Sequence, residues 1–238
     1  MTRILRTGAA GFLLLTLLVA GGCSWNARSG NPELPEMHKS LQKTVDLQTG
    51  IVLGDLGKTQ RAASWILAQE GPSPYSSEGR PYEEEMLGIA SDIAQAPDLP
   101  TAAAQTGRFA ASCGTCHQAL ERGPRFRVGD EAPDGESQEA MMIRHLWAAD
   151  RMWEGLVGPS DESWIAGATA MAETQPELAR VFRASTGGTG SESFLSEVNT
   201  LARAGVSATG QAERGKIYGE LLNTCNRCHA PMGIMVQR

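Results

Sequence analysis

Apolar and polar positions along most of this chain alternate at helical spacing. Between residues 36 and 55 one set recurs at steps of three and four, on one predicted helix face: His38, Leu41, Gln42, Val45, Thr49 and Val52. Similar patterns predict helices over about 58–70, 82–96, 98–117, 139–157, 161–173, 191–204 and 210–230. Glycine and proline mark loops at 71–81 and 183–190. We therefore expect an all-α fold.

The order of landmarks occurs twice. Each half has a lone histidine near its start, four predicted helices and a Cys-x-x-Cys-His segment at its end. At an offset of 104 residues, Gly54 aligns with Gly158 and Ala62 with Ala166. We interpret the halves, 36–121 and 139–238, as two tandem antiparallel four-helix bundles joined by a polar linker at 122–138.

Residues 1–22 have the features of an export signal. Arg3 and Arg6 precede a short apolar run, and small residues lead directly into Cys23. This arrangement resembles a bacterial lipoprotein signal, which implies that Cys23 is acylated and that residues 23–35 form a tether at a periplasmic membrane surface. The alternative is ordinary cleavage near Gly22, with Cys23 unmodified.

The charge balance argues against nucleic acid as a partner. The chain has 21 basic and 27 acidic side chains, a formal net charge of −6. Loss of Arg3 and Arg6 with the signal makes the mature chain more acidic still. Phosphate binding needs a basic surface, so we expect protein partners instead.

The five cysteines carry the most specific signal. Apart from Cys23, they form two copies of one motif, which run from Cys113 through Cys116 to His117 and from Cys225 through Cys228 to His229. The two thiols of such a motif lie about one helical turn apart and can bond the two vinyl groups of one porphyrin, while the adjacent histidine reaches the iron. We therefore predict two covalently bound c-type haems.

Two other interpretations of the motifs compete with haem. A four-thiolate zinc site would bring both cysteine pairs together and would leave His117 and His229 without a role. A redox-active dithiol would be expected within alternating strands and helices, a pattern not seen around either motif.

A haem motif at the end of the last helix of a four-helix unit resembles the cytochrome c-prime family and its low-spin relatives. The resemblance covers each half and implies an antiparallel bundle. It also implies that Cys113, Cys116, Cys225 and Cys228 attach the haems, with His117 and His229 as proximal iron ligands. Each unit is shorter than is usual in that family.

The sixth iron ligand decides the chemistry. In an up-down-up-down bundle, the start of the first helix lies at the same end as the close of the fourth. His38 and His145 are therefore our candidates for the sixth ligand of the first and second haem. Methionine competes at Met37, Met141 and Met142, and a vacant position would favour gas or peroxide binding.

No acid–base pair, nucleophile or phosphate loop accompanies the motifs, so we expect an electron carrier rather than an enzyme. It would pass single electrons between redox partner proteins in the periplasm. Two alternatives stay open. One is a haem enzyme or gas- or peroxide-binding protein with one five-coordinate haem, and the other is a fixed cytochrome subunit of a respiratory or photosynthetic complex.

Overall fold

A computed structural model describes residues 33–69, 76–126, 131–186 and 191–232, which contain eight α-helices and no strand. The all-α prediction is therefore confirmed for this part of the chain. The helices are α1 (Glu33–Val52), α2 (Leu56–Leu67), α3 (Arg80–Ala94), α4 (Leu99–Ala119), α5 (Gln138–Val157), α6 (Asp161–Thr186), α7 (Ser191–Ser207) and α8 (Gln211–Met232). The predicted signal peptide, Cys23 and most of the tether lie outside the described residues.

Side-chain caps explain where several helices begin. Asp98 accepts a hydrogen bond of 2.8 Å from the amide of Thr101, and Asp55 accepts one of 2.7 Å from the amide of Lys58. Ser137 caps α5 through the amide of Ala140 at 3.1 Å. Most observed bounds lie within about three residues of the predicted ones. The exception is α6, which continues to Thr186 rather than ending near residue 173.

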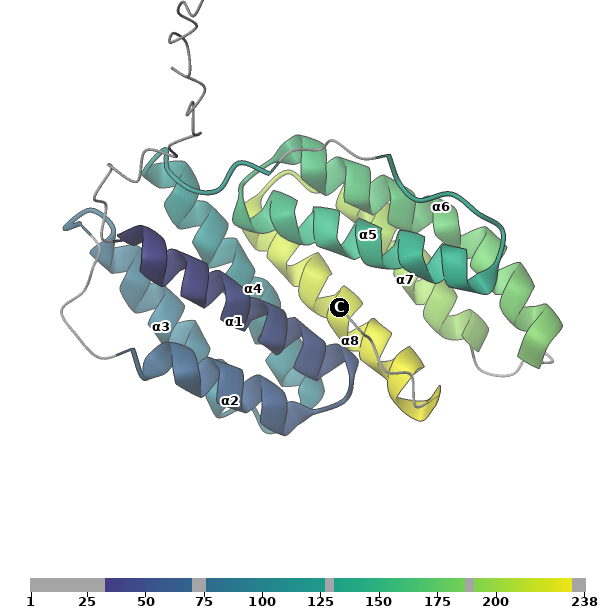
Figure 1. Ribbon diagram of the computed structural model, residues 1–238, viewed down its shortest axis with the longest axis horizontal. Coiled ribbons are helices and arrows are strands. Elements are labelled where there is room, and N and C mark those ends of the chain that lie inside the picture. Colours follow the sequence, from purple (N-terminus) through teal and green to yellow (C-terminus); the bar gives the residue numbers. More distant parts are fainter. Residues whose placement is uncertain (1–32, 70–75, 127–130, 187–190, 233–238) are drawn as a thin grey trace, which may run out of the picture. The chain divides into compact units, whose positions relative to one another are not determined.

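Helices α1 to α4 pack in sequence order, and α1 also contacts α4 (Figure 1). Their shared core is a cluster of apolar side chains: Leu47, Ala62, Ala63, Ile66, Met86, Ile89, Ala90, Ile93 and Phe109. One sequence prediction was wrong in register here. The fully buried stripe of α1 consists of Thr44, Leu47, Gln48 and Ile51, whereas Val45, Thr49 and Val52 are only partly buried. The stripe shifts because α1 faces both α4 and α8, so a second face is covered.

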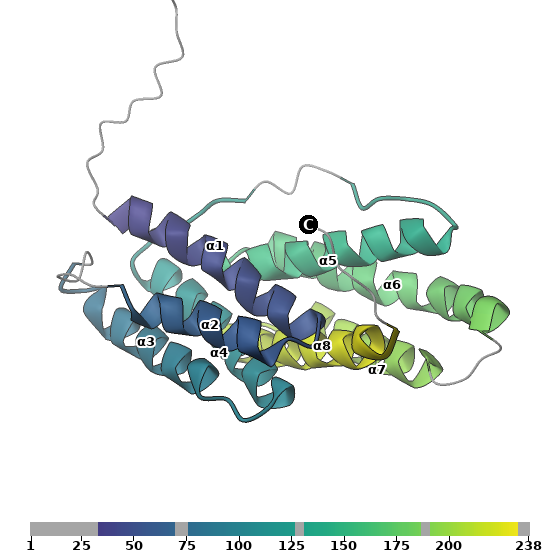
Figure 2. The same ribbon diagram turned by 60° about the horizontal axis from the view of Figure 1, so that its bottom comes forward.

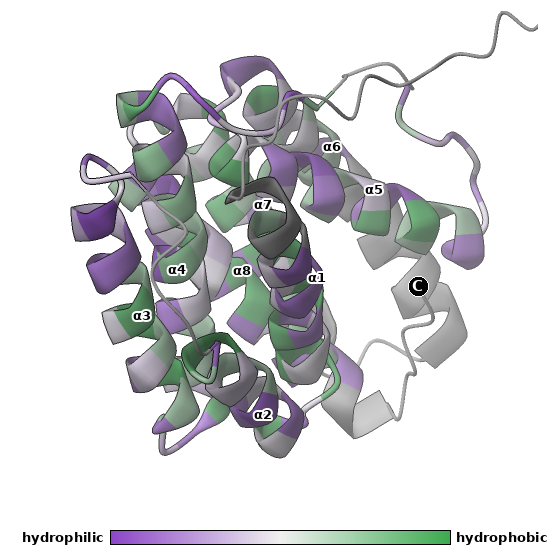
Figure 3. Cartoon of the chain, turned by 60° about the vertical axis from the view of Figure 1, so that its left-hand side comes forward, coloured by the Kyte–Doolittle hydropathy of each residue, from purple (hydrophilic) through white to green (hydrophobic). Residues whose placement is uncertain are grey.

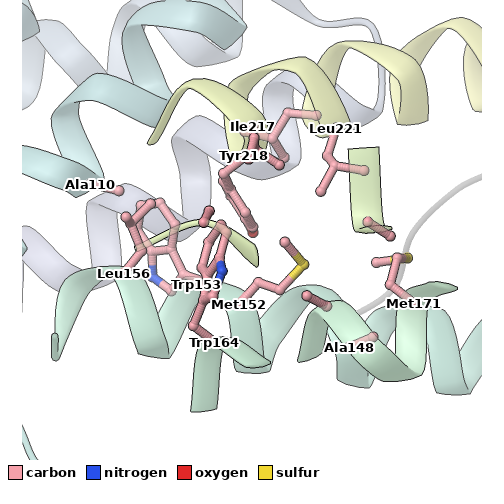
Figure 4. Packing of buried hydrophobic residues seen from close by; sticks show 14 of the residues in the cluster. Ala110, Ala148, Met152, Trp153, Leu156, Trp164, Met171, Ile217, Tyr218 and Leu221 are labelled. Carbon is pink, nitrogen blue, oxygen red and sulfur yellow. The ribbon is translucent and has the colours of Figure 1, made fainter. Parts of the chain in front are cut away.

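Helices α5 to α8 repeat this order of contacts, and Figure 2 shows the two groups of four side by side. Their core contains the aromatic pair Trp153 and Tyr218, with ring centroids 5.5 Å apart, and the buried Met152 and Trp164 (Figure 4). The indole of Trp164 donates a hydrogen bond of 2.7 Å to the carbonyl of Gly205. These four residues belong to the apolar core of this group of helices.

The two groups meet where α4 crosses α8. Glycine at these positions lets the two backbones approach closely. A Cβ on Gly215 would lie 2.7 Å from the carbonyl oxygen of Gly107, and a Cβ on Gly219 would lie 2.8 Å from the carbonyl oxygen of Ala103. As residue numbers rise along α4, the numbers of the residues that they contact on α8 fall, so the two helices are antiparallel. The contact is also reciprocal, because alignment of the two Cys motifs makes Ala103 equivalent to Gly215 and Gly107 equivalent to Gly219.

Figure 3 shows α4 and α8 side by side in the interior, with hydrophilic residues along the outer side of α3.

Residues 33–238 form one compact unit. Among the described residues, no helix is both long and apolar enough to cross a membrane. The division into two domains at 122–138 stays a prediction.

Candidate functional site

The first Cys-x-x-Cys-His motif lies in the last two turns of α4. Cys113 packs against the cores of both helix groups, and Cys116 and His117 are partly buried. The ring Nδ1 of His117 is 2.8 Å from the carbonyl oxygen of Val157, at the end of α5. A carbonyl can only accept, so Nδ1 is the protonated nitrogen. This tautomer leaves Nε2 with the lone pair that a metal ligand needs.

The second motif lies in the last two turns of α8. Among the described residues, buried atoms around it lack hydrogen-bond partners: Nδ1 of His229, Nδ2 of Asn226 and Oδ1 of Asn223. Such orphaned groups are rare in a packed protein interior. The described residues around this end of α8 therefore leave three buried polar atoms without a hydrogen-bond partner.

An ion-pair network holds the second motif against α7. Arg227, inside the motif, donates to both carboxylate oxygens of Glu197 at 2.9 and 2.8 Å. The hydroxyl of Thr224 donates to the same carboxylate at 2.9 Å. The guanidinium also lies 5.0 Å from the ring centroid of Phe194. These contacts fix the turn that carries Cys225 and Cys228.

The thiols are poor nucleophiles in this environment. Burial, with a smaller effect from the neighbouring thiol of Cys116, raises the pKa of Cys113 to about 12. Burial and the neighbouring Cys228 do the same for Cys225, whose pKa is also raised to about 12. Redox-active cysteine pairs have lowered pKa values, so these shifts argue against a dithiol oxidoreductase.

His145 lies on α5 and is partly buried. Burial of its ring lowers its pKa from 6.5 to about 4, and the electrostatic influence of His229 contributes to this shift. Burial also lowers the pKa of His229. Both rings are therefore neutral near pH 7, the form that binds iron. The electrostatic influence of His229 thus reaches His145. The assignment of both residues to the second haem stays a prediction.

His38 lies in the first turns of α1, and its side chain lies outside the described part of the structure. Figure 1 places the start of α1 and the C-terminal end of α4 toward the same side, as an up-down-up-down order requires. Of the competing methionines, Met141 is buried, while Met37 and Met142 are partly buried.

The two motifs lie far apart. Cys116 follows Gly107 by nine residues on α4, and Cys228 follows Gly215 by thirteen on α8. Since α4 and α8 are antiparallel, a rise of about 1.5 Å per residue separates the motifs by about 30 Å along the helices. No three His, Cys, Asp or Glu side chains among the described residues form an ion-binding group. The two cysteine pairs therefore do not form the four-thiolate zinc site considered above.

The residues present fit a covalently attached haem. Each motif offers two thiols one turn apart and a histidine, and the second adds His145 together with orphaned polar atoms. Sequence reasoning missed Val157, since a backbone carbonyl leaves no signal in the side-chain pattern. It also missed Asn226, although the contrast of Gly114 with Asn226 at matching motif positions was visible.

Comparison with known proteins gives no relative: no family model, curated protein or solved structure matches this chain.

Proposed function

We propose that this chain is a dihaem c-type cytochrome that transfers single electrons in the periplasm. Cys113 and Cys116 would attach one haem and Cys225 and Cys228 the other, with His117 and His229 as proximal ligands. When bound, each haem supplies an iron that cycles between Fe(III) and Fe(II) by one electron. In this proposal the halves are tandem four-helix bundles related to the cytochrome c-prime family.

The observation that carries the proposal is that His229 acts electrostatically on His145. The two rings come from different helices, His145 from α5 and His229 from the motif on α8, and the electrostatic influence of His229 contributes to the lowered pKa of His145. Burial keeps both rings uncharged near pH 7, and the neutral imidazole is the form that binds a metal ion. His145 would be the sixth ligand of the second haem, and His38 would serve the first by the same topology.

If histidines hold each haem, the surrounding chain would have two tasks. It would hold the ligand rings in one tautomer and would exclude water from the iron. His117 does the first through its hydrogen bond to Val157. The electron would come from a reduced one-electron carrier protein and pass to an oxidised one.

The predicted lipoprotein signal suggests where in the cell the protein acts. An acylated Cys23 would tether the protein to the periplasmic face of a membrane, close to membrane-bound redox partners. The acidic balance of the chain favours partners with basic docking surfaces.

The test is expression of the full chain in a host with c-type haem assembly machinery. We expect two covalent haems per chain by pyridine haemochrome assay and intact mass, and Cys225→Ser with Cys228→Ser should leave one. Reduced protein should not bind carbon monoxide rapidly, because in this proposal His38 and His145 would occupy the remaining ligand position of each iron. Absence of covalent haem would refute the proposal, and fast stoichiometric carbon monoxide binding would favour an open-site haem protein instead.

A further inference from the structure

We infer that the two haem sites differ in reduction potential, the site at His117 being the harder to reduce, and that the carbonyl of Val157 sets the difference. The inference rests on the proposed function. It concerns residues that surround the motifs and that the proposal does not otherwise use. Val157 acts as a positioning residue, since it touches the ligand ring and not the iron.

At the first site, the ring of His117 is held on both sides. Its Nδ1–H donates to the Val157 carbonyl at 2.8 Å, and a Cβ added to Gly123 would lie 2.6 Å from the ring carbon Cγ. Hydrogen bonding of Nδ1–H to a carbonyl makes the imidazole a stronger electron donor through Nε2. A stronger donor stabilises Fe(III) relative to Fe(II), which lowers the reduction potential.

The Val157 carbonyl is available because α5 ends there. The last four carbonyls of a helix have no donor from a following turn, and Gly158 is the C-cap of α5. Phe126 covers this end, since a Cβ on Gly158 would lie 2.7 Å from its ring. The end of α5 is therefore fixed in position, with an unused acceptor directed at the ring of His117.

Gly114 is what lets α5 come this close. It is the second residue of the first motif, and a Cβ there would collide with the carbonyl oxygen of Leu156 and would lie 3.0 Å from Nε2 of Gln211. Any side chain at Gly114 would push the end of α5 away from α4. The lack of a side chain at Gly114 therefore allows the hydrogen bond between His117 and the carbonyl of Val157.

The second site differs from the first at the position equivalent to Gly114. Contacts of α1 with α8 correspond to those of α5 with α4 in the reciprocal packing of the halves. Where the first motif has Gly114, the second has Asn226, a buried residue whose Nδ2 lacks a partner. The Nδ1 of His229 is likewise buried without a partner among the described residues. His229 is therefore the weaker donor.

The first experiment uses the unmodified holoprotein. A spectropotentiometric titration should resolve two one-electron waves. Hydrogen bonds to metal-ligating histidines typically change metal affinity or activity by 10–100-fold, so we expect the ratio of Fe(III) to Fe(II) to be about tenfold higher at the first site. For a one-electron couple, tenfold corresponds to about 59 mV. With ¹⁵N-labelled histidine, the hydrogen-bonded ring N–H of His117 should exchange more slowly in D₂O than the ring N–H of His229, which has no acceptor among the described residues.

Gly114→Asn gives the first motif the residue of the second. We expect the lower wave to move toward the upper one, the upper wave to stay, and the protected ring N–H to be lost. Thr115→Asn is the matched control, because Thr115 is exposed in the same motif and should leave both waves unchanged. If Gly114→Asn does not fold, the exchange measurement on the unmodified protein still decides.

Coincident waves in a protein that carries two haems would overturn the inference and leave the proposed function standing. Equal exchange of the two proximal ring N–H groups, or a lower wave unmoved in folded Gly114→Asn, would do the same. A protein without covalent haem would refute the function itself, and the inference with it.

Discussion

The hydroxyl of Tyr218 on α8 donates a hydrogen bond of 2.8 Å to Oε1 of Gln48 on α1, and both side chains are buried. This bond joins residues 170 positions apart in sequence and crosses from one group of four helices to the other. The ring of Tyr218 also packs on Trp153 in the core of the second group (Figure 4). A single side chain thus ties α1 to the interior of α5–α8.

Tyr218→Phe should lower the free energy of unfolding by about 1–3 kcal/mol, because it leaves the Gln48 amide oxygen buried without a donor. Urea unfolding followed by circular dichroism measures the loss. Tyr82→Phe is the control, since Tyr82 is only partly buried and its hydroxyl can reach water. Equal effects of the two substitutions would contradict the buried role of the Tyr218–Gln48 bond.

Gly107→Ala should destabilise the protein by about 1–3 kcal/mol, although alanine is the better helix former. Its Cβ would meet the backbone of α8, including the amide nitrogen of Gly219 at 2.8 Å, and backbone cannot rotate aside. Gly88→Ala on α3 is the matched control, because its Cβ would meet nothing within 4 Å. That variant should gain up to about 1 kcal/mol by helix propensity. Stabilisation by both would mean that α4 and α8 do not touch at Gly107.

The haem-free chain should lose stability as pH falls from about 6.5 to about 4. In this window the unfolded state protonates His145, whose ordinary pKa is 6.5, while the folded state resists protonation down to a pKa of about 4. The unfolded state therefore binds more protons, so stability rises with pH across this range. Urea midpoints at pH 7 and pH 4.5 measure the slope. His145→Leu should flatten it, and an unchanged slope would show that His145 is accessible to water.

His145→Ala in the holoprotein should remove the low-spin ferric signal of one haem and leave the other unchanged. The open position would then bind carbon monoxide when that iron is reduced. EPR and absorption spectra measure both effects. His38→Ala is the matched variant and should act on the other haem. A methionine-to-iron charge-transfer band that survives both substitutions would instead assign Met37, Met141 or Met142 as ligands.

Much of the fold was predictable because its signals are local. Asp98 followed by Pro100, and Ser160 before Asp161, mark helix starts by capping chemistry that needs only neighbouring residues. The prediction that His145 serves the motif on α8 rests on the up-down order of four helices. These inferences require no knowledge of which helix faces which.

The antiparallel crossing of α4 and α8 was not predicted, because apolar periodicity shows that a face is buried but not against what. A signal existed in the small residues four apart on both motif-bearing helices, Ala103 with Gly107 and Gly215 with Gly219. The burial register of α1 was wrong for the same reason. A helix that contacts two neighbours has two covered faces, and one amphipathic stripe cannot describe both.

The reciprocal contact of Gly107 with Gly215 and Ala103 with Gly219 has the form of the interface in a symmetric homodimer, where each copy presents the same patch to the other. In a homodimer both sites are encoded by one gene segment and stay identical. In a single chain that constraint is absent, because each position can change alone, and the matching positions Gly114 and Asn226 do differ. The two motif-bearing ends of this protein are therefore chemically different.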